Sequence, residues 1–266
     1  MGTIGFYGAG NMAHAIIHGM LAEGLYQKEE ILVYNHRYEP TLKKLEEQYQ
    51  IRPILDEKEL FAKTDLIIFA VKPEILLAKL PGFKQFLTEE HLLVSIAAGV
   101  TIQQMEELVG LHKIVRVMPN TPAAVGEGMT SVSINSEVTD SEQAKVLQVF
   151  QSFGRAVVLP ESQIDAVVGV SGSSPAYAYL FIEALADGAV LEGMKRTDAY
   201  EFAAQAVLGA AKMVLETGEH PGALKDKVCS PGGTTIAAVR SLEANGFRHA
   251  VIEAVQTAAK KNRELT

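Results

Sequence analysis

The sequence predicts an α/β domain built on a parallel sheet, followed by an all-α domain. In the first 160 or so residues, short β-branched or aromatic runs alternate with helix-like segments. After Pro160 the strand-like runs stop, alanine becomes frequent, and helical periodicity continues almost to the end. We therefore expect one domain over residues 1–160 and a second over residues 161–266, and 266 residues are enough to give each a core.

Seven short runs are predicted as strands of the first domain because they are rich in β-branched and aromatic residues. They are Thr3–Tyr7, Ile31–Tyr34, Leu66–Ala70, Leu92–Ser95, Ile114–Met118, Thr130–Ile134 and Ala156–Leu159. Periodic apolar segments between them, such as Met12–Glu23 and Leu42–Tyr49, predict helices that cover the sheet.

Two further helix starts carry the spacing of a capping box. Thr101 with Gln104, and Thr139 with Glu142, place a hydroxyl three residues before a side chain that can return the hydrogen bond. We therefore expect a helix to begin directly after each threonine.

The second domain has its own helix signals. Ser174-Pro175 predicts an N-cap and first turn for a helix that ends near Leu191. Asp198 with Glu201 predicts the start of the next helix, which ends near Leu215.

Small residues recur at close spacing in this half and let helix backbones approach one another. They are Ala184, Ala186, Gly188, Ala189, Ala203, Ala204, Ala206, Gly209, Ala210 and Ala211. Helices with such narrow apolar faces build a thin core, so we expect the domain to complete its core against a second copy, as an isologous homodimer.

Composition argues against several classes of protein. The formal net charge is -8 and no long Lys/Arg cluster is present, so no nucleic-acid partner is expected. No apolar run reaches the ~18 residues of a membrane-spanning helix, and no basic leader precedes the first strand. Cys229 is the single cysteine, which favours a reducing compartment, and we predict a cytoplasmic protein that does not bind membranes.

A glycine motif follows the first predicted strand. Gly8, Gly10 and Ala13 form GxGxxA at the point where strand gives way to helix. Glycine at 8 permits a tight turn, glycine at 10 lets a pyrophosphate reach the backbone, and the helix N-terminus favours the negative charge. The motif predicts a Rossmann-type dinucleotide site with cofactor contacts at Gly8, Ala9, Gly10, Asn11 and Met12.

The residues after the second strand decide which dinucleotide fits. An acidic side chain there would bind a ribose 2′-hydroxyl, but the sequence has Asn35 and Arg37 instead. Both can donate hydrogen bonds to a 2′-phosphate, so NADP(H) is favoured over NAD(H). The alternative is that Arg37 is an ordinary solvated turn residue.

Three other strand ends should lie at the same sheet edge, because ligands of open parallel sheets bind beyond the carboxyl ends of the strands. We expect cofactor contacts there at Ala70, Val71, Lys72, Pro73, Ala98 and Asn120. Each segment alone could also be an ordinary turn.

His14 and His18 have the spacing of two metal ligands on a helix, but the sequence indicates no third ligand. We expect no metal.

Six segments together resemble the pyrroline-5-carboxylate reductase family over nearly the whole chain. They are GAGNMA at 8–13, AVKP at 70–73, SIAAGVTI at 95–102, VRVMPNTP at 115–122, SGSSPAYAYLFIEALADG at 171–188 and HPGALKDKVCSPGGTT at 220–235. The resemblance implies a Rossmann domain, a helical dimerisation domain, and reduction of a cyclic imine to proline with NADPH, or with NADH. It also implies a homodimer, which some members assemble into decamers.

The same resemblance places the substrate on the loop from Ser230 to Thr235. It implies a carboxylate cradle made by Ser230, Gly232, Gly233 and Thr234, with Thr235 hydrogen-bonded to the ring nitrogen as the catalytic residue. Glycine amides and a helix N-terminus suit an anion. The alternative is that Pro-Gly-Gly is only a turn and the threonines are helix caps.

Two other functions stay open at this point. One is a β-hydroxyacid-type dehydrogenase of similar architecture, although the region from Val170 to Tyr177 has no lysine to serve as its catalytic residue. The other is an NADP-binding regulator without turnover.

Overall fold

The computed structural model describes residues 2–265, the last of them by its backbone alone. Contacts divide these residues into two compact units. Unit 1 runs up to Gly172 and resumes at Ala258, whereas unit 2 is Ser173–Thr257. The domain boundary predicted near residue 160 stays a prediction.

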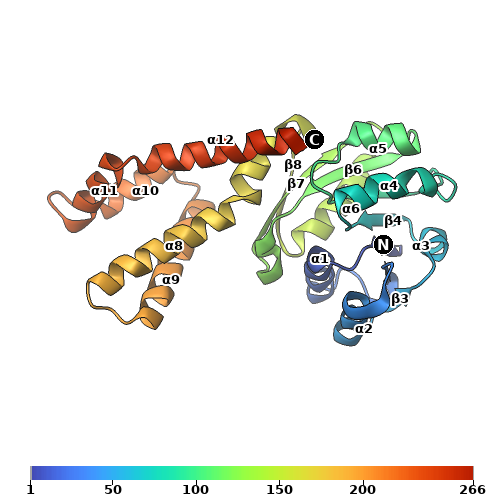
Figure 1. The fold of residues 1–266 in the computed structure, drawn as a ribbon, viewed down its shortest axis with the longest axis horizontal. Coiled ribbons are helices and arrows are strands. Elements are labelled where there is room, and N and C mark those ends of the chain that lie inside the picture. Colours follow the sequence, from blue (N-terminus) through green and yellow to red (C-terminus); the bar gives the residue numbers. More distant parts are fainter. Residues whose placement is uncertain (1, 266) are drawn as a thin grey trace. The chain divides into compact units, whose positions relative to one another are not determined.

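Unit 1 is built on one sheet that helices flank (Figure 1). The sheet has eight strands in the order β3-β2-β1-β4-β5-β6-β7-β8. The strands are β1 Ile4–Tyr7, β2 Ile31–Tyr34, β3 Arg52–Ile54, β4 Leu66–Phe69, β5 Leu92–Ser95, β6 Lys113–Met118, β7 Gly128–Ile134 and β8 Gly154–Val158. All neighbouring strands are parallel except β6 and β7, which are antiparallel. The chain leaves β1 for β2 and β3 and then returns to β4 on the other side of β1, so the topological switch point lies at β1.

Helices cover both faces of this sheet. They are α1 Asn11–Ala22, α2 Lys43–Tyr49, α3 Glu57–Lys63, α4 Pro73–Phe83, α5 Ile102–Val109, α6 Asp140–Gln151 and α7 Ile164–Val167, with short helical turns η1 Lys28–Glu30, η2 Tyr38–Leu42, η3 Thr121–Val125, η4 Glu161–Gln163 and η5 Val168–Gly172. One core cluster joins α1, α2 and α6 to the sheet, and a second joins α3, α4 and α5.

The predicted fold class is confirmed, and the differences have simple causes. Thr101 and Thr139 cap α5 and α6 through complete capping boxes, as predicted. Strand β3 was missed because Pro53 interrupts its pattern, and it is tolerated because β3 is an edge strand. The sheet is mixed and not wholly parallel, because β7 runs against β6.

Unit 2 is helical throughout the part that the structure describes. Its helices are α8 Ser174–Leu191, α9 Arg196–Thr217, α10 Pro221–Val228, α11 Thr234–Ala244 and α12 Phe247–Leu265, the last of which ends within unit 1. None of the helices described in residues 2–265 is both long and apolar enough to cross a bilayer.

Two predicted helix starts are wrong by one or two residues. The N-cap of α8 is Ser173, so Ser174 lies inside the first turn and Pro175 follows it where no intrahelical hydrogen bond is lost. Helix α9 begins at Arg196, so Asp198 is an acidic residue of the first turn and not its cap. Such an acid is favourable there because it faces the positive end of the helix.

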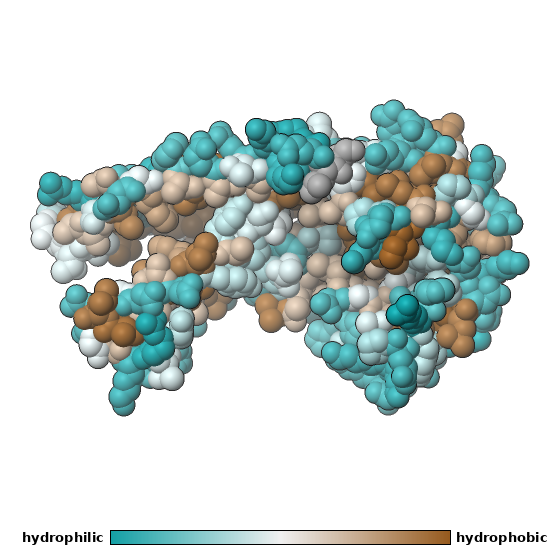
Figure 2. Space-filling view, viewed as in Figure 1, coloured by the Kyte–Doolittle hydropathy of each residue, from teal (hydrophilic) through white to brown (hydrophobic). Residues whose placement is uncertain are grey.

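Unit 2 buries little apolar surface of its own. Its buried hydrophobic cluster consists of Ala186, Ala199 and Ala203, with partly buried neighbours. Large hydrophobic side chains remain exposed on α8 and α9, and Figure 2 shows brown, hydrophobic residues gathered there. They include Tyr179, Leu180, Leu185, Leu191, Tyr200, Phe202, Leu208, Met213 and Leu215. A surface this apolar marks an interaction surface.

Candidate active site

At the end of β1, the backbones of the two neighbouring strands lie close to Gly8. The Gly8 amide donates to the Tyr34 carbonyl oxygen at 2.8 Å, which ties β1 to the end of β2. Gly8 has φ +116°, and a Cβ built on it would lie 2.8 Å from the carbonyl carbon of Ala70, at the end of β4. The close approach and the left-handed backbone therefore require glycine at this position.

Helix α1 begins directly after this turn with open donors. Gly10 is its N-cap and supplies no side chain, so the first-turn amides that begin at Asn11 and Met12 have no capping oxygen. A Cβ at Gly10 would meet only Ala70, at 4.0 Å, so space is left above the backbone. Ala9 and Ala13 are buried and hold the turn against the sheet. Open amides, space and the positive end of a helix fit a pyrophosphate.

A cavity of about 300 Å³ adjoins Gly8 at the same sheet edge. It is lined by Tyr7, Gly8, Tyr34, Asn35, His36, Val71, Ile75 and Lys79. The aliphatic side chains Val71 and Ile75 offer an apolar wall that suits a flat nucleobase. Sequence reasoning named Val71 but missed Ile75 and Lys79, although these two lie four residues apart and therefore share one face of α4.

Two residues that line this cavity, Tyr7 and Lys79, contact the partly exposed carboxylate of Glu57. The Tyr7 hydroxyl donates to Oε2 of Glu57 at 3.0 Å, and Nζ of Lys79 approaches the same oxygen at 3.3 Å. Burial raises the pKa of Tyr7, and the charge of Glu57 raises it further, so Tyr7 stays a hydrogen-bond donor.

In the turn after β2, the side chain of Asn35 is hydrogen-bonded within the turn, whereas that of Arg37 is exposed. The side-chain amide of Asn35 donates to the Arg37 carbonyl at 2.7 Å and to Oγ1 of Thr41 at 3.3 Å, so its donors hold the turn. Arg37 is exposed, and its guanidinium pairs with no carboxylate among the described residues. Its role toward a 2′-phosphate, and the alternative that it is only solvated, both stay open.

The other predicted contacts follow β4, β5 and β6, whose carboxyl ends share one edge of the sheet. After β4, Ala70 is half-buried, Lys72 is the N-cap of α4, and Pro73 is its first residue. After β5, Ala98 is exposed in the loop that leads to α5. The structure thus brings these segments to one edge.

Asn120, after β6, is buried and both ends of its amide are engaged. Its Nδ2 donates to the Ser171 carbonyl at 2.9 Å, and its Oδ1 accepts from the Met129 amide at 2.8 Å. The side chain therefore holds its own loop in place.

His14 and His18 flank the ring of Tyr49, with centroids 6.3 and 6.1 Å from it. Burial lowers the pKa of His14, as does the charge of Lys44. Over residues 2–265, no group of three or more His, Cys, Asp or Glu side chains is arranged to hold a metal ion.

The loop from Ser230 to Thr235 lies in unit 2 and forms a tight turn. The Gly233 amide donates to the Ser230 carbonyl at 3.0 Å, and Gly232 between them has φ +68°, as in a type II turn with proline at its second position. The Gly233 amide is thus engaged, and the amides left for an anion are those of Gly232 and of the first turn of α11.

The hydroxyls of this loop are available. Helix α11 begins at Thr234 with Gly233 as N-cap and has no side-chain cap, so the alternative that the threonines are caps is wrong. Within the described residues, the hydroxyls of Ser230, Thr234 and Thr235 make no hydrogen bond. Free hydroxyls beside an open helix N-terminus can receive a carboxylate.

Comparison with known proteins identifies the family. Residues 161–265 match the family described as pyrroline-5-carboxylate reductase dimerisation, and residues 3–99 match the family described as NADP oxidoreductase, coenzyme F420-dependent. The chain is 53% identical to the pyrroline-5-carboxylate reductase of Escherichia coli K12, over 99% of this chain and 98% of that protein. The chain belongs to the pyrroline-5-carboxylate reductase family.

Solved pyrroline-5-carboxylate reductases share the fold. The chain is similar to the enzyme from Coxiella burnetii, with a TM-score of 0.94 and 34% identity over 100% of this chain and 98% of that one. It is also similar to the Plasmodium falciparum enzyme with NADP bound, with a TM-score of 0.87 and 35% identity over 99% and 98%. The family resemblance drawn from the motifs is confirmed, and the β-hydroxyacid-type dehydrogenase is left without support.

Proposed function

We propose that this protein reduces the C=N bond of 1-pyrroline-5-carboxylate with NADPH and releases L-proline. Bound NADPH supplies the hydride. The observation that carries the proposal is the open N-terminus of α11 beside three free hydroxyls on Ser230, Thr234 and Thr235. Family membership and the cavity beside Gly8 at the sheet edge of unit 1 support it.

The turn of unit 2 binds the substrate carboxylate in this proposal. The amides of Gly232 and of Thr234 donate to it, and the Ser230 hydroxyl completes the cradle. The positive end of α11 adds to the attraction for a negative charge. Gly233 takes part by forming the turn that aims these groups.

Thr235 orients the ring nitrogen through its hydroxyl. Residues 230–235 contain no titratable side chain, and none is needed to make the substrate reactive, because a protonated imine is already an electrophile. The loop therefore contributes alignment, which alone can lower a barrier by several kcal/mol, roughly 7 in favourable cases.

Unit 1 binds the dinucleotide. Gly8, Ala9, Gly10, Asn11 and Met12 receive the pyrophosphate, and Arg37 receives the 2′-phosphate within a turn that Asn35 holds. Ala70, Val71, Lys72, Pro73, Ala98 and the loop of Asn120 form the rim along the cofactor. NADH, which lacks the 2′-phosphate, is a weaker cofactor in this proposal.

The protein acts as a homodimer in this proposal, since a dimerisation domain is present and the apolar side chains of α8 and α9 require cover. Light scattering on a gel-filtration column tests this and would also reveal decamers. The cytoplasmic location stays a prediction.

The test is an assay of NADPH oxidation by purified protein with 1-pyrroline-5-carboxylate. Wild type should turn over, and Thr235→Ala should lose about 100-fold in kcat, as expected for removal of one orienting donor. NADPH affinity should change less than about twofold, because Thr235 is outside the nucleotide site. Ser241→Ala, which removes another hydroxyl of α11, is the matched control and should behave as wild type.

Two results would contradict the proposal. Unchanged kinetics of Thr235→Ala would remove its role at the ring nitrogen. Tight NADPH binding without any turnover would instead favour the regulator considered above.

A further inference from the structure

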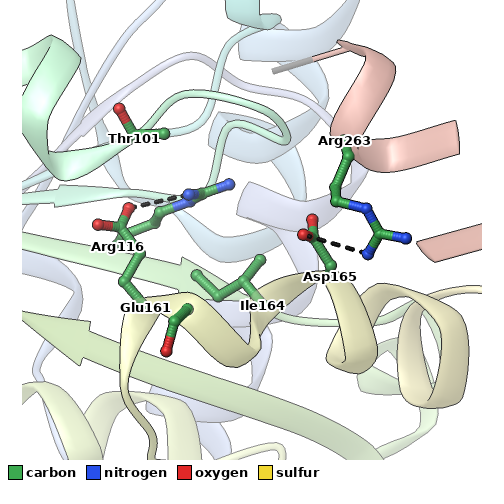
Figure 3. A pocket seen from close by; sticks show the side chains of 7 residues that line it. Thr101, Arg116, Glu161, Ile164, Asp165 and Arg263 are labelled. Atoms are coloured by element: carbon green, nitrogen blue, oxygen red, sulfur yellow. Dashed lines mark hydrogen bonds and ion pairs between the residues drawn. The ribbon is translucent and has the colours of Figure 1, made fainter. Parts of the chain in front are cut away.

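A separate cavity of about 470 Å³ opens in unit 1 between strand β6 and the segment that begins at η4 (Figure 3). Arg116 and Glu161 form one ion pair in its wall, and Asp165 and Arg263 form another. None of these four residues belongs to the nucleotide edge or to the loop of residues 230–235. All of them lie in unit 1.

Arg116 is the unusual member of this group. It is 5% exposed, although it projects from a central position of β6. Its Nη1 donates to Oε1 of Glu161 at 2.8 Å, whereas its Nε and Nη2 contact no acceptor among the described residues. Figure 3 shows the guanidinium extending into the cavity. These two donors are not enclosed by protein, so they face the cavity, where an anionic ligand can accept charge-assisted hydrogen bonds from them.

The carboxylates of the cavity can also accept a further hydrogen bond or ion pair. Oε1 of Glu161 accepts from Arg116 and from the Ile102 amide at 2.9 Å, but its Oε2 accepts no hydrogen bond from the described residues. In Asp165, Oδ1 accepts from Nδ2 of Asn262 at 2.7 Å, whereas Oδ2 is held only loosely, 3.6 Å from Nη1 of Arg263. A cationic group can therefore pair with Oε2 of Glu161 and with the loosely held Oδ2 of Asp165 in the same cavity.

We propose that this cavity binds a small zwitterion, an α-amino or imino acid. Its carboxylate lies between the guanidinium groups of Arg116 and Arg263, and its ammonium faces Glu161 and Asp165. The four side chains carry two positive and two negative charges. A simple anion or a simple cation would meet a like charge there, whereas a zwitterion pairs both of its charges.

Equilibrium dialysis of radiolabelled L-proline against the full chain tests the proposal without relying on turnover. Arg263→Gln should weaken binding by about tenfold or more, because a charge-assisted hydrogen bond is lost. Arg248→Gln is the matched control, since Arg248 lies on the same helix and pairs with Glu243 outside the cavity. Thr235→Ala should keep this binding, which separates it from any proline held by the substrate loop.

A second variant guards against misfolding. Arg116→Lys keeps the charge but not the fork of donors, and it should also weaken proline binding, with its thermal unfolding midpoint measured alongside. Acetate and pyrrolidine, which carry one charge each, should compete poorly. Equal affinity in wild type, Arg263→Gln and Arg116→Lys would overturn the site, and effective competition by acetate would overturn the zwitterion in favour of a simple anion. Normal NADPH oxidation beside either result would leave the proposed function intact.

Discussion

The two units of this chain bury their apolar side chains in different ways. Unit 1 has a core on each face of its sheet, with fully buried phenylalanine, isoleucine and leucine side chains. Unit 2 has three buried alanines at its centre and leaves large apolar side chains exposed. Unit 1 is thus specified by contacts within one chain, whereas unit 2 depends on contacts that one chain does not supply.

The same contrast separates the two ligand-binding segments. Gly8 is enclosed by the backbone of Ala70, so its conformation is fixed by the sheet around it. Gly232 also has positive φ, but a Cβ built there would meet nothing within 4 Å. A substitution at Gly8 should therefore meet both a collision and the strain of a positive φ, whereas one at Gly232 should meet only the strain.

The largest effect is expected for Gly8→Ala. The new Cβ adds a collision with Ala70 to the cost of a positive φ, so the free energy of unfolding of unit 1 should fall by about 3 kcal/mol and NADPH binding should be lost. Urea unfolding followed by tyrosine fluorescence measures this, since the chain has no tryptophan.

Gly24→Ala is the control for Gly8→Ala. Gly24 has φ +64° with open space around it, so only the conformational cost of about 1 kcal/mol should remain. Equal losses in the two variants would show that the collision at Gly8 is relieved by movement of β4.

The next largest effect is expected for Phe202→Asp, which should weaken association between copies of the chain. Phe202 is 67% exposed on α9, and a carboxylate in the apolar face should weaken association by about 2 kcal/mol or more. Sedimentation or light scattering over a concentration series measures the shift. Leu111→Asp is the control, because Leu111 is 77% exposed on unit 1, away from α8 and α9 in the sequence. A matching loss in both variants would break the contrast between the units.

Sequence alone predicted the features that depend on local chemistry. The capping boxes at Thr101 and Thr139 involve residues three apart, and the glycine motif at residues 8–13 contains its own geometric reasons. Both features could therefore be predicted without knowledge of distant contacts.

Features that depend on contacts between distant residues could not be predicted from the sequence. The donors of Asn35 are turned to its own loop, and those of Asn120 to Ser171 and Met129, which no local pattern reveals. Lys79 lines the same cavity as Tyr7 because the Tyr7 ring packs against Phe83 of α4. Nothing in the sequence pattern of the strand around Arg116 indicated a buried guanidinium, which pairs with Glu161, a residue 45 positions later in the chain.

Arg37→Ala should have a smaller effect, confined to the nucleotide. Loss of a charge-assisted contact to the 2′-phosphate should weaken NADPH about tenfold and leave NADH nearly unchanged. Fluorescence titration of each cofactor measures it. Arg52→Ala is the control, because Arg52 lies on neighbouring β3 and pairs with Glu59. Equal weakening of NADPH and NADH would contradict the 2′-phosphate assignment.

The smallest effect on stability is expected for removal of an ion pair in unit 1, compared with removal of an exposed ion pair in unit 2. Burial acts to raise the pKa of Glu142, but hydrogen bonds from Lys113, at 2.8 Å, and from Thr139 outweigh it and hold the pKa below its usual value. A lowered pKa in the folded state means that the carboxylate stabilises above its unfolded pKa of roughly 4.3 and loses this effect as pH falls through the folded value. Glu142→Gln should therefore cost about 1 kcal/mol at neutral pH and nothing in acid. The exposed pair Lys212 and Glu216 of unit 2 is the control, and Glu216→Gln should change stability at neither pH. A loss for Glu142→Gln that persists unchanged at low pH would assign the effect to packing and not to charge.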